Sequence, residues 1–319
     1  MMRLTPVILK RCIQLSLIFI TLTSCLSTAN GQGQGKWVTR APMPSSRTEV
    51  AVVELIGKIY IIGGFGTGGD LVEEFDPATN SWRRRASLPA PLHHVGAAAA
   101  GGKIYVIGGY SGRWDAVDTV YEYDPVTDKW RTRTSMPTPR GALAVGVVGD
   151  KIFAVGGVRH DRKNTSANEA YDPTTDRWTK HAPMPTPRDH LAIGVVEGKL
   201  YAIGGRVDGS YATNLAHNEE YDPKADRWRA RAPMPTPRSG IAAAALDGRI
   251  FVFGGESPSG TFNQTESYEP AQNEWQSWAP MPTARHGLGA AVLGKQIYVM
   301  SGGPKPGGTY SSANEVFIP

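Results

Sequence analysis

The chain has 319 residues, of which 34 are Lys or Arg and 29 are Asp or Glu, giving a formal net charge of +5. Residues 1–24 hold three of the basic residues and no acidic one, so the remainder is nearly balanced, with 31 basic and 29 acidic residues. This balance, without a basic stripe interleaved with aromatic side chains, excludes nucleic acid as a partner. The only two cysteines, Cys12 and Cys25, precede the repeats described below, which excludes disulfides and thiol chemistry from the folded part.

Residues 1–24 have the pattern of a signal peptide. Three basic residues precede an apolar stretch at 13–23 that is too short to span a bilayer as a helix. The sequence LTSC, ending at Cys25, resembles a bacterial lipobox and predicts acylation of Cys25, whereas cleavage at the small residues 27–29 would give a freely secreted protein. In both cases we expect export to the periplasm, the cell surface or the medium, with a lipid at Cys25 as the only membrane contact. Residues 25–35, rich in Gly and Gln, are predicted to be a flexible linker.

Residues 36–319 consist of one pattern written six times. Ten residues separate each Trp from an Arg or its replacement, and sixteen more lead to a Gly-Gly pair. The Trp positions are 37, 82, 130, 178, 228 and 275, the Arg positions are 47, 92, 140, 188, 238 and 285, and the pairs begin at 63, 108, 156, 204, 254 and 301. The segment after each pair varies from 8 to 13 residues. A period of this length with one variable segment indicates stacked supersecondary units.

Each unit predicts four antiparallel strands of decreasing apolarity. The first, such as residues 95–100 or 191–196, is made of small apolar residues and is expected to be buried on both faces near an axis. The second follows a turn containing Gly, the third ends in Asp-Pro, and the fourth holds the Trp among charged residues. The repeats start with a lone fourth strand at 36–41 and end with a third strand at 313–319. We therefore predict that the N-terminal strand completes the last blade. The fold class is therefore an all-β, six-bladed propeller without an open edge.

The Gly-Gly pairs, the Trp spacing and turns such as Tyr123-Asp124-Pro125 resemble Kelch repeats over residues 36–319. The resemblance implies a Kelch β-propeller. Kelch propellers include protein-binding modules, a periplasmic sialic acid mutarotase and copper radical oxidases of the galactose oxidase type, so the fold does not select a function. The oxidase chemistry needs a Cys in the propeller, and this propeller has none. We therefore expect no cofactor.

The Arg that ends each MPTPR-like segment is predicted to form a buried ion pair. In the second unit Leu92 replaces the Arg and, in the same unit, Tyr121 replaces a Glu. Both partners change together, as a buried pair requires, because a stranded charge costs about 3–5 kcal/mol. The predicted pairs are Arg47 with Glu73, Arg140 with Glu169, Arg188 with Glu219, Arg238 with Glu266, and Arg285 with Glu315.

Ligand binding is predicted on the face where the variable segments and the residues after each Arg emerge together. We call it the loop face. The predicted ligand-binding residues are His93, Tyr110, Trp114, Arg159, His160, Asp189, His190, Arg206, Tyr211, Glu256 and His286. The aromatic residues with Arg206 and Arg159 would suit a sugar or an acidic peptide through stacking and bidentate carboxylate contacts. We expect no metal site, because the histidines belong to alternate blades and should surround the channel instead of one ion.

Two functions and a purely structural role remain open. The first is a binding module without catalytic residues, which presents the loop face to a protein or a glycan. The alternative is an exported sugar mutarotase or epimerase, similar to the sialic acid enzyme, whose acid and base come from Glu49, Asp189, Glu256 and the rim histidines.

Overall fold

The structure is a computed structural model that describes residues 1–2, 34–66 and 68–319. The predicted signal peptide, Cys25 and all but the last two residues of the predicted linker lie outside the described residues, so the predictions for them stay predictions. The described part of the chain has no helix with the length and apolarity that a bilayer crossing needs. Its one helical element is the single 3-10 turn η1 (Tyr211–Thr213).

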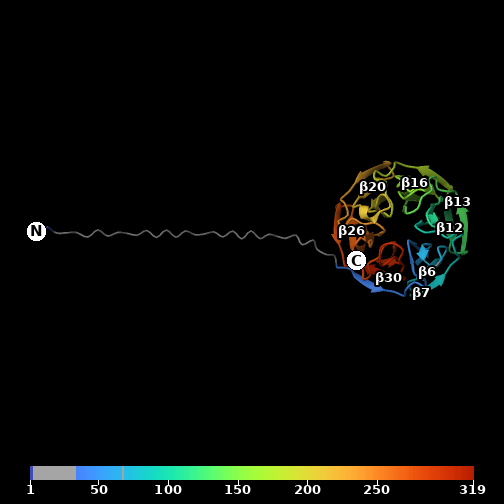
Figure 1. Ribbon diagram of the computed structural model, residues 1–319, viewed down its shortest axis with the longest axis horizontal. Helices are drawn as coiled ribbons and strands as arrows, with labels where there is room; N and C mark the ends of the chain where they lie inside the picture. Colours follow the sequence, from blue (N-terminus) through green and yellow to red (C-terminus); the bar gives the residue numbers. More distant parts are fainter. Residues whose placement is uncertain (3–33, 67) are drawn as a thin grey trace. The chain divides into compact units, whose positions relative to one another are not determined.

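Six four-stranded antiparallel sheets form a wheel, which confirms the predicted six-bladed propeller (Figure 1). Blades 1 to 3 contain β3 (Ala51–Leu55), β4 (Lys58–Ile62), β6 (Val72–Asp76) and β7 (Ser81–Arg84); β8 (Gly96–Ala100), β9 (Lys103–Ile107), β12 (Val120–Asp124) and β13 (Lys129–Arg133); and β14 (Ala144–Val148), β15 (Lys151–Val155), β16 (Asn168–Asp172) and β17 (Arg177–Lys180). Blades 4 to 6 contain β18 (Ala192–Val196), β19 (Lys199–Ile203), β20 (Asn218–Asp222) and β21 (Arg227–Ala230); β22 (Ala242–Leu246), β23 (Arg249–Phe253), β26 (Thr265–Glu269) and β27 (Glu274–Ser277); and β28 (Gly289–Leu293), β29 (Gln296–Met300), β30 (Asn314–Ile318) and β1 (Lys36–Thr39). Two-residue strands lie in the connecting segments: β2 (Arg47–Thr48), β5 (Phe65–Gly66), β10 (Tyr110–Ser111), β11 (Asp115–Ala116), β24 (Glu256–Ser257) and β25 (Gly260–Thr261).

The head of the domain closes blade 6, as predicted. β1 pairs antiparallel with β30, and Trp37 lies opposite Phe317. In Figure 1 the first and last colours of the wheel meet at this blade. Beyond β1, the N–H of Arg40 donates to the carbonyl of Asn314 at 3.0 Å, which extends the junction. The first and last strands of the wheel therefore cover each other's edges.

The innermost strands differ from the prediction, because only one of their faces is buried. Buried and half-buried residues alternate along β8, β14, β18 and β22. The half-buried side chains, such as Val145 and Ile193, line an axial channel with a cavity of about 240 Å³. Crowding around the axis explains the small residues: a Cβ on Gly96 would lie 2.4 Å from Cγ1 of Val145 in the next blade.

The repeated Trp side chains connect neighbouring blades. Each indole Nε1–H donates to a backbone carbonyl at the end of the preceding blade, at 2.8–3.0 Å. Each ring also packs on a Phe or Tyr of the third strand in its own blade, with centroids 4.8–5.3 Å apart. The outermost strand is thereby fixed to the blade before it.

The Gly-Gly pairs allow a close approach between blades. Both residues of each pair have positive φ, and a Cβ on the first would lie 2.4–2.7 Å from a carbonyl oxygen at the Arg position of the next blade. Ser301 replaces the first Gly in blade 6 with the same backbone conformation, at φ 64°. Its hydroxyl donates to the carbonyl of Arg47 at 2.6 Å, so the approach becomes a hydrogen bond.

The five Arg–Glu pairs are in contact, and all five guanidinium groups are fully buried. Arg47 to Glu73, Arg140 to Glu169 and Arg188 to Glu219 measure 2.7, 2.6 and 2.5 Å, and Arg238 contacts Glu266 as Arg285 contacts Glu315. In blade 2 the replacements Leu92 and Tyr121 are both buried in one apolar cluster. These arginines therefore connect strands, and none of them belongs to the loop-face cavity described next.

Candidate functional site

Six backbone positions, one from each blade, form a closed hydrogen-bonded ring at the loop face. They lie two residues after each Arg position: Glu49, His94, Ala142, His190, Gly240 and Gly287. Each N–H donates to the carbonyl of the ring residue in the adjacent blade, at 2.7–3.1 Å, and the last bond returns from Glu49 to Gly287. All six residues have φ between 51° and 65°. We call this the inner ring.

Three inner-ring positions carry ionisable side chains although the backbone conformation favours glycine. A residue with a Cβ in this region costs about 1 kcal/mol or more, and such residues cluster at functional sites. The glycines of the ring leave space for these side chains: a Cβ on Gly287 would lie 2.5 Å from Oε1 of Glu49. The ring therefore combines backbone strain at Glu49, His94 and His190 with room for them to meet.

A cavity of about 390 Å³ opens on the loop-face side of the inner ring. Its lining comes from the variable segments of five blades and from the residues after the Arg positions: Thr48, Glu49, Phe65, His94, Arg113, Trp114, His190, Arg206, Gly209, Tyr211, Glu256, His286, Gly307, Gly308 and Tyr310. Trp114 and Tyr310 are 45% and 46% exposed. The volume lies in the range of small-molecule sites, roughly 300–1,000 Å³.

A buried ionic network around Arg206 forms one side of the cavity floor. Its guanidinium contacts Oε1 of Glu256 at 2.7 Å, Oδ1 of Asp189 at 3.3 Å and Nε2 of His190 at 3.0 Å. A guanidinium has donors only, so Nε2 of His190 accepts, and its Nδ1–H donates to Asp189. Burial by itself would raise the pKa of Asp189, but its contacts with His190, Arg206 and Asn164 outweigh burial and lower that pKa. The contacts with Asp189 and Arg206 thus fix the orientation of the His190 ring.

A second chain of contacts connects His93, His94 and Glu49. The Nδ1 atoms of the two histidines are 2.6 Å apart, and Nε2 of His94 is 3.4 Å from Oε2 of Glu49. Burial lowers the pKa of His93 to about 4. Burial, reinforced by His190, His93 and Arg206, holds the pKa of His94 well below its usual value. Both imidazoles are therefore neutral at pH 7, and one Nδ1 donates to the other.

His286 lies between two carboxylates. Its Nε2 is 3.7 Å from Oε1 of Glu49 and 3.6 Å from Oε2 of Glu256, while its Nδ1 is 3.1 Å from the carbonyl of Gly303. A carbonyl only accepts, so Nδ1 carries a hydrogen, and Nε2 lies near both carboxylates but beyond hydrogen-bond distance. Around the floor, three carboxylates (Glu49, Asp189 and Glu256) accompany one buried guanidinium that is already bonded to two of them. This surrounding favours hydrogen-bond donors and disfavours anions.

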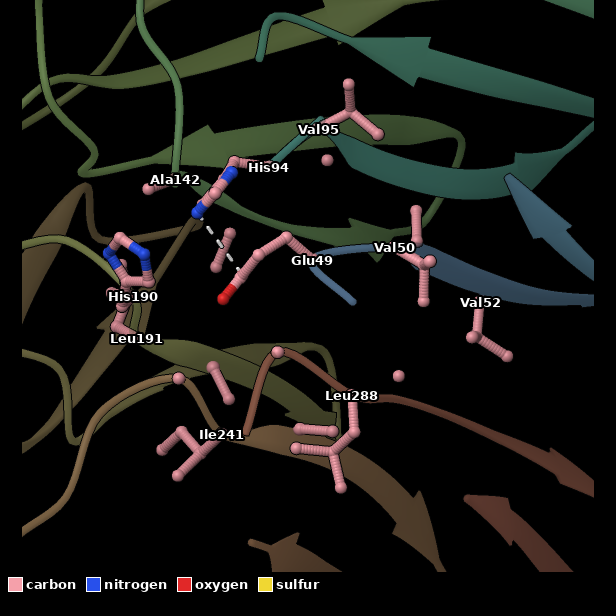
Figure 2. Close-up of a pocket in the computed structure, with 18 of the residues that line it drawn as sticks. Glu49, Val50, Val52, His94, Val95, Ala142, His190, Leu191, Ile241 and Leu288 are labelled. Carbon is pink, nitrogen blue, oxygen red and sulfur yellow. Dashed lines mark ion pairs between the residues drawn. The ribbon is translucent and has the colours of Figure 1, made fainter. Parts of the chain in front are cut away.

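The inner ring also separates the loop-face cavity from the axial channel. Figure 2 shows Glu49, His94 and His190 pointing toward one another, with a dashed line between His94 and Glu49. Apolar side chains line the channel beside them: Val50, Val52, Val95, Leu191, Ile241 and Leu288. The loop-face cavity and the axial channel therefore share these three residues as a common boundary.

The structure brings together six of the eleven residues predicted to bind a ligand: Trp114, His190, Arg206, Tyr211, Glu256 and His286. The other five do not line the cavity. His93 is buried against Phe65, with ring centroids 3.7 Å apart, and Tyr110 is buried against Trp114. Asp189 is fully buried beneath its partners. Arg159 pairs with Asp161 at 2.5 Å, and His160 beside it is exposed, both outside the lining.

Two expectations about the site are wrong in their geometry. Arg206 does not present its donors to a ligand, because Glu256, Asp189 and His190 occupy them. The rim histidines do not keep apart around the channel: the ring centroids of His94 and His190 are 5.0 Å apart, across the small Ala142. Phe65 was missed, although it follows a Gly pair in the same register position as Arg206 and Glu256.

The wheel of Trp contacts, Gly pairs and buried Arg–Glu bridges defines a six-bladed propeller of the Kelch type. The family model described as the KLHDC2/KLHL20/DRC7 Kelch-repeats domain matches residues 25–205 and, in a second match, residues 181–318, so the chain belongs to this Kelch-repeat family. None of the curated proteins matches the chain. It is similar to a solved structure titled "Structure of YjhT", at 16% identity and a TM-score of 0.76, over 86% of this chain and 95% of that chain. Similarity at this identity concerns the fold alone.

Proposed function

We propose that this protein is an exported carbohydrate-binding module that holds a neutral sugar in the loop-face cavity. The observation that carries the proposal is the pairing of exposed aromatic rings at the mouth with carboxylate acceptors at the floor of one cavity. Aromatic faces suit the apolar side of a sugar ring, and sugar hydroxyls donate to carboxylates. An anionic sugar would bring its charge toward Glu49 and Glu256, while the nearby Arg206 is already engaged.

A small ligand fits this face better than a protein partner. A stable protein interface buries roughly 800 Å² on each partner and depends on clustered apolar or aromatic anchors. Among the described residues, Trp114 and Tyr310 are the large apolar side chains exposed on this face, and both line the cavity. The recess, and not a flat patch around it, is therefore the recognition surface that we propose.

Replacing the mouth aromatics tests the proposal. We expect Trp114→Ala and Tyr310→Ala each to weaken sugar binding at least about tenfold, equivalent to about 1.4 kcal/mol, because each removes a stacking face. The probes are glucose, galactose, mannose, N-acetylglucosamine and sialic acid, measured by saturation-transfer NMR and titration calorimetry. Val126→Ala is the matched control, since Val126 is 84% exposed in the β12–β13 turn on the opposite face. Binding that is unchanged in both aromatic variants, or tighter for sialic acid than for every neutral sugar, contradicts the proposal.

A sugar mutarotase or epimerase is the second candidate, and one observation favours it. The carboxylate of Glu49 is 3.4 Å from Nε2 of His94 and 3.7 Å from Nε2 of His286, so groups able to exchange a proton lie together at the cavity floor. Anomer equilibration of glucose and of sialic acid, followed by NMR, tests it. The rate should rise above that in buffer and fall back in Glu49→Gln. No acceleration by the wild-type protein removes this candidate and leaves the binding module.

Export is part of the proposal and rests on the signal-like residues 1–24 and on the LTSC sequence. The mature chain would begin at an acylated Cys25 and be tethered to a membrane by lipid, or begin after residue 29 and be free. Mass spectrometry of the N-terminal peptide separates the two products. A chain that keeps Met1 in the cytoplasm contradicts export.

A further inference from the structure

We propose that Glu49, His94 and His190 bind one divalent transition-metal ion on the cavity side of the inner ring. One ligand atom from each of the three lies within 4.8 Å of the other two. Nε2 of His94 and Oε2 of Glu49 are 3.4 Å apart. Two ligands on one zinc ion, with bonds of about 2.0–2.2 Å, have about this separation in a tetrahedron. The other two separations in this set are at most 4.8 Å.

The second nitrogen of each histidine is already engaged, as metal-binding imidazoles require. Nδ1 of His190 is hydrogen-bonded to the carboxylate of Asp189, and Nδ1 of His94 is 2.6 Å from Nδ1 of His93. Metal-ligating histidines almost always donate the other ring N–H to a carboxylate, a backbone carbonyl or water, which fixes the tautomer and the ring orientation. His190 has such a partner in Asp189, and His94 fits the pattern when its Nδ1–H is the donor to His93. An ion would therefore bind Nε2 in both residues, although Nε2 of His190 now accepts from Nη2 of Arg206 at 3.0 Å.

The backbone places the three ligands with unusual rigidity. All three project from the hydrogen-bonded inner ring, and all three hold the left-handed conformation in spite of its cost. The same three residues line both the loop-face cavity and the axial channel, so a fourth coordination position would face the sugar site or the channel. Three protein ligands with one open position are the pattern of catalytic zinc sites, and two imidazoles with a carboxylate suit zinc, cobalt or nickel better than calcium or magnesium.

One existing hydrogen bond competes with the proposed ion for a ligand atom. Nη2 of Arg206 is 3.0 Å from Nε2 of His190, so an ion would displace this contact. Arg206 keeps its bonds to Glu256 and Asp189, which hold the guanidinium beside the ion without needing His190. Three carboxylates (Glu49, Asp189 and Glu256) face the guanidinium of Arg206 and the exposed guanidinium of Arg113, so the surrounding charge is net negative and attracts a dication. The proposal stands apart from sugar binding and is tested without sugar.

The test uses the mature protein, freed of metal with a chelator and dialysed, and titrated with Co²⁺ by visible absorption and with Zn²⁺ by calorimetry. We expect one ion per chain, with the visible bands of four- or five-coordinate Co²⁺. His94→Asn and His190→Asn remove one imidazole each with a residue that tolerates positive φ, and Glu49→Gln removes the carboxylate. Each should weaken Co²⁺ binding at least about 100-fold. His160→Asn and His217→Asn, in exposed parts of the loops, are the matched controls and should bind like wild type.

Absence of visible bands at about 1 mM Co²⁺ would overturn the proposal, and so would bands that persist in both His94→Asn and His190→Asn. Circular dichroism shows whether each variant folds. If the Asn variants do not fold, NMR of the Co²⁺-loaded wild type replaces them: two strongly shifted, exchangeable imidazole N–H signals are expected from His94 and His190. Fewer than two such signals counts against the site.

Discussion

Arg188→Leu is expected to lower the free energy of unfolding by about 3–5 kcal/mol, because it leaves Glu219 as an uncompensated charge in the interior. Arg188 is fully buried, and its Nη1 is 2.5 Å from Oε2 of Glu219. It also donates to the carbonyls of Gly204, Thr186 and Ala202 at 2.8–2.9 Å. Urea denaturation followed by Trp fluorescence measures the loss.

The chain itself supplies the compensating change. Adding Glu219→Tyr to Arg188→Leu reproduces the Leu92 and Tyr121 combination that blade 2 buries in its apolar cluster. We expect the double variant to recover most of the loss, since replacing both buried charges by apolar groups is often neutral. The control is Lys295→Ala in the exposed Lys295–Asp247 pair, whose side chains are 78% and 61% exposed, and it should leave stability unchanged. A double variant as unstable as the single one would assign the cost to the lost carbonyl bonds instead.

These pairs show why so much of the fold could be predicted from one sequence. The six copies of the unit can be aligned with one another. In blade 2 the Arg and Glu positions both change, to Leu92 and Tyr121, and this joint change identifies the two positions as partners in the other blades. Blade number and closure follow from the incomplete units at the two ends. The burial of β8 and β14 was overestimated, because an apolar run does not distinguish a packed neighbour from a narrow channel.

The sequence predicts the face of the propeller that carries the site, but not which of its side chains contact one another. Register gives the blade of each residue and its face, which placed His190, Glu256 and Trp114 together correctly. Register gives no distance from the axis. For this reason the sequence predicts that His94 and His190 lie apart, whereas their ring centroids are 5.0 Å apart in the structure. All six inner-ring residues have the left-handed conformation, and the glycines at two of these positions, Gly240 and Gly287, are the sequence signal for it. The ion pairs around Arg206 could not be predicted, because they depend on side-chain positions that residue spacing does not give.

Removing β1 is expected to cost at least about 4 kcal/mol and to make the protein associate. Truncating a well-packed Trp costs about 3–5 kcal/mol by itself. Trp37 donates to the carbonyl of Ala279 at 2.9 Å and packs on Phe317 with centroids 5.0 Å apart. Without β1, the backbone of β30 becomes an unpaired edge, which is a template for another chain. The test compares a chain that begins at Arg40 with one that begins at Gln34, by thermal unfolding and size-exclusion chromatography.

The two chains differ only in residues 34–39, so a difference in their unfolding temperatures measures what the β1–β30 pairing contributes to stability. The longer chain should unfold like the full-length protein, and Trp37→Ala in it should fall between the two. A peptide of residues 34–41 added to the shorter chain should restore the unfolding temperature, since the free edge of β30 accepts a strand in the register of Trp37 opposite Phe317. Equal unfolding temperatures for the two chains would mean that the contacts among the inner strands hold the wheel closed, and that the outer pairing of head and tail contributes little.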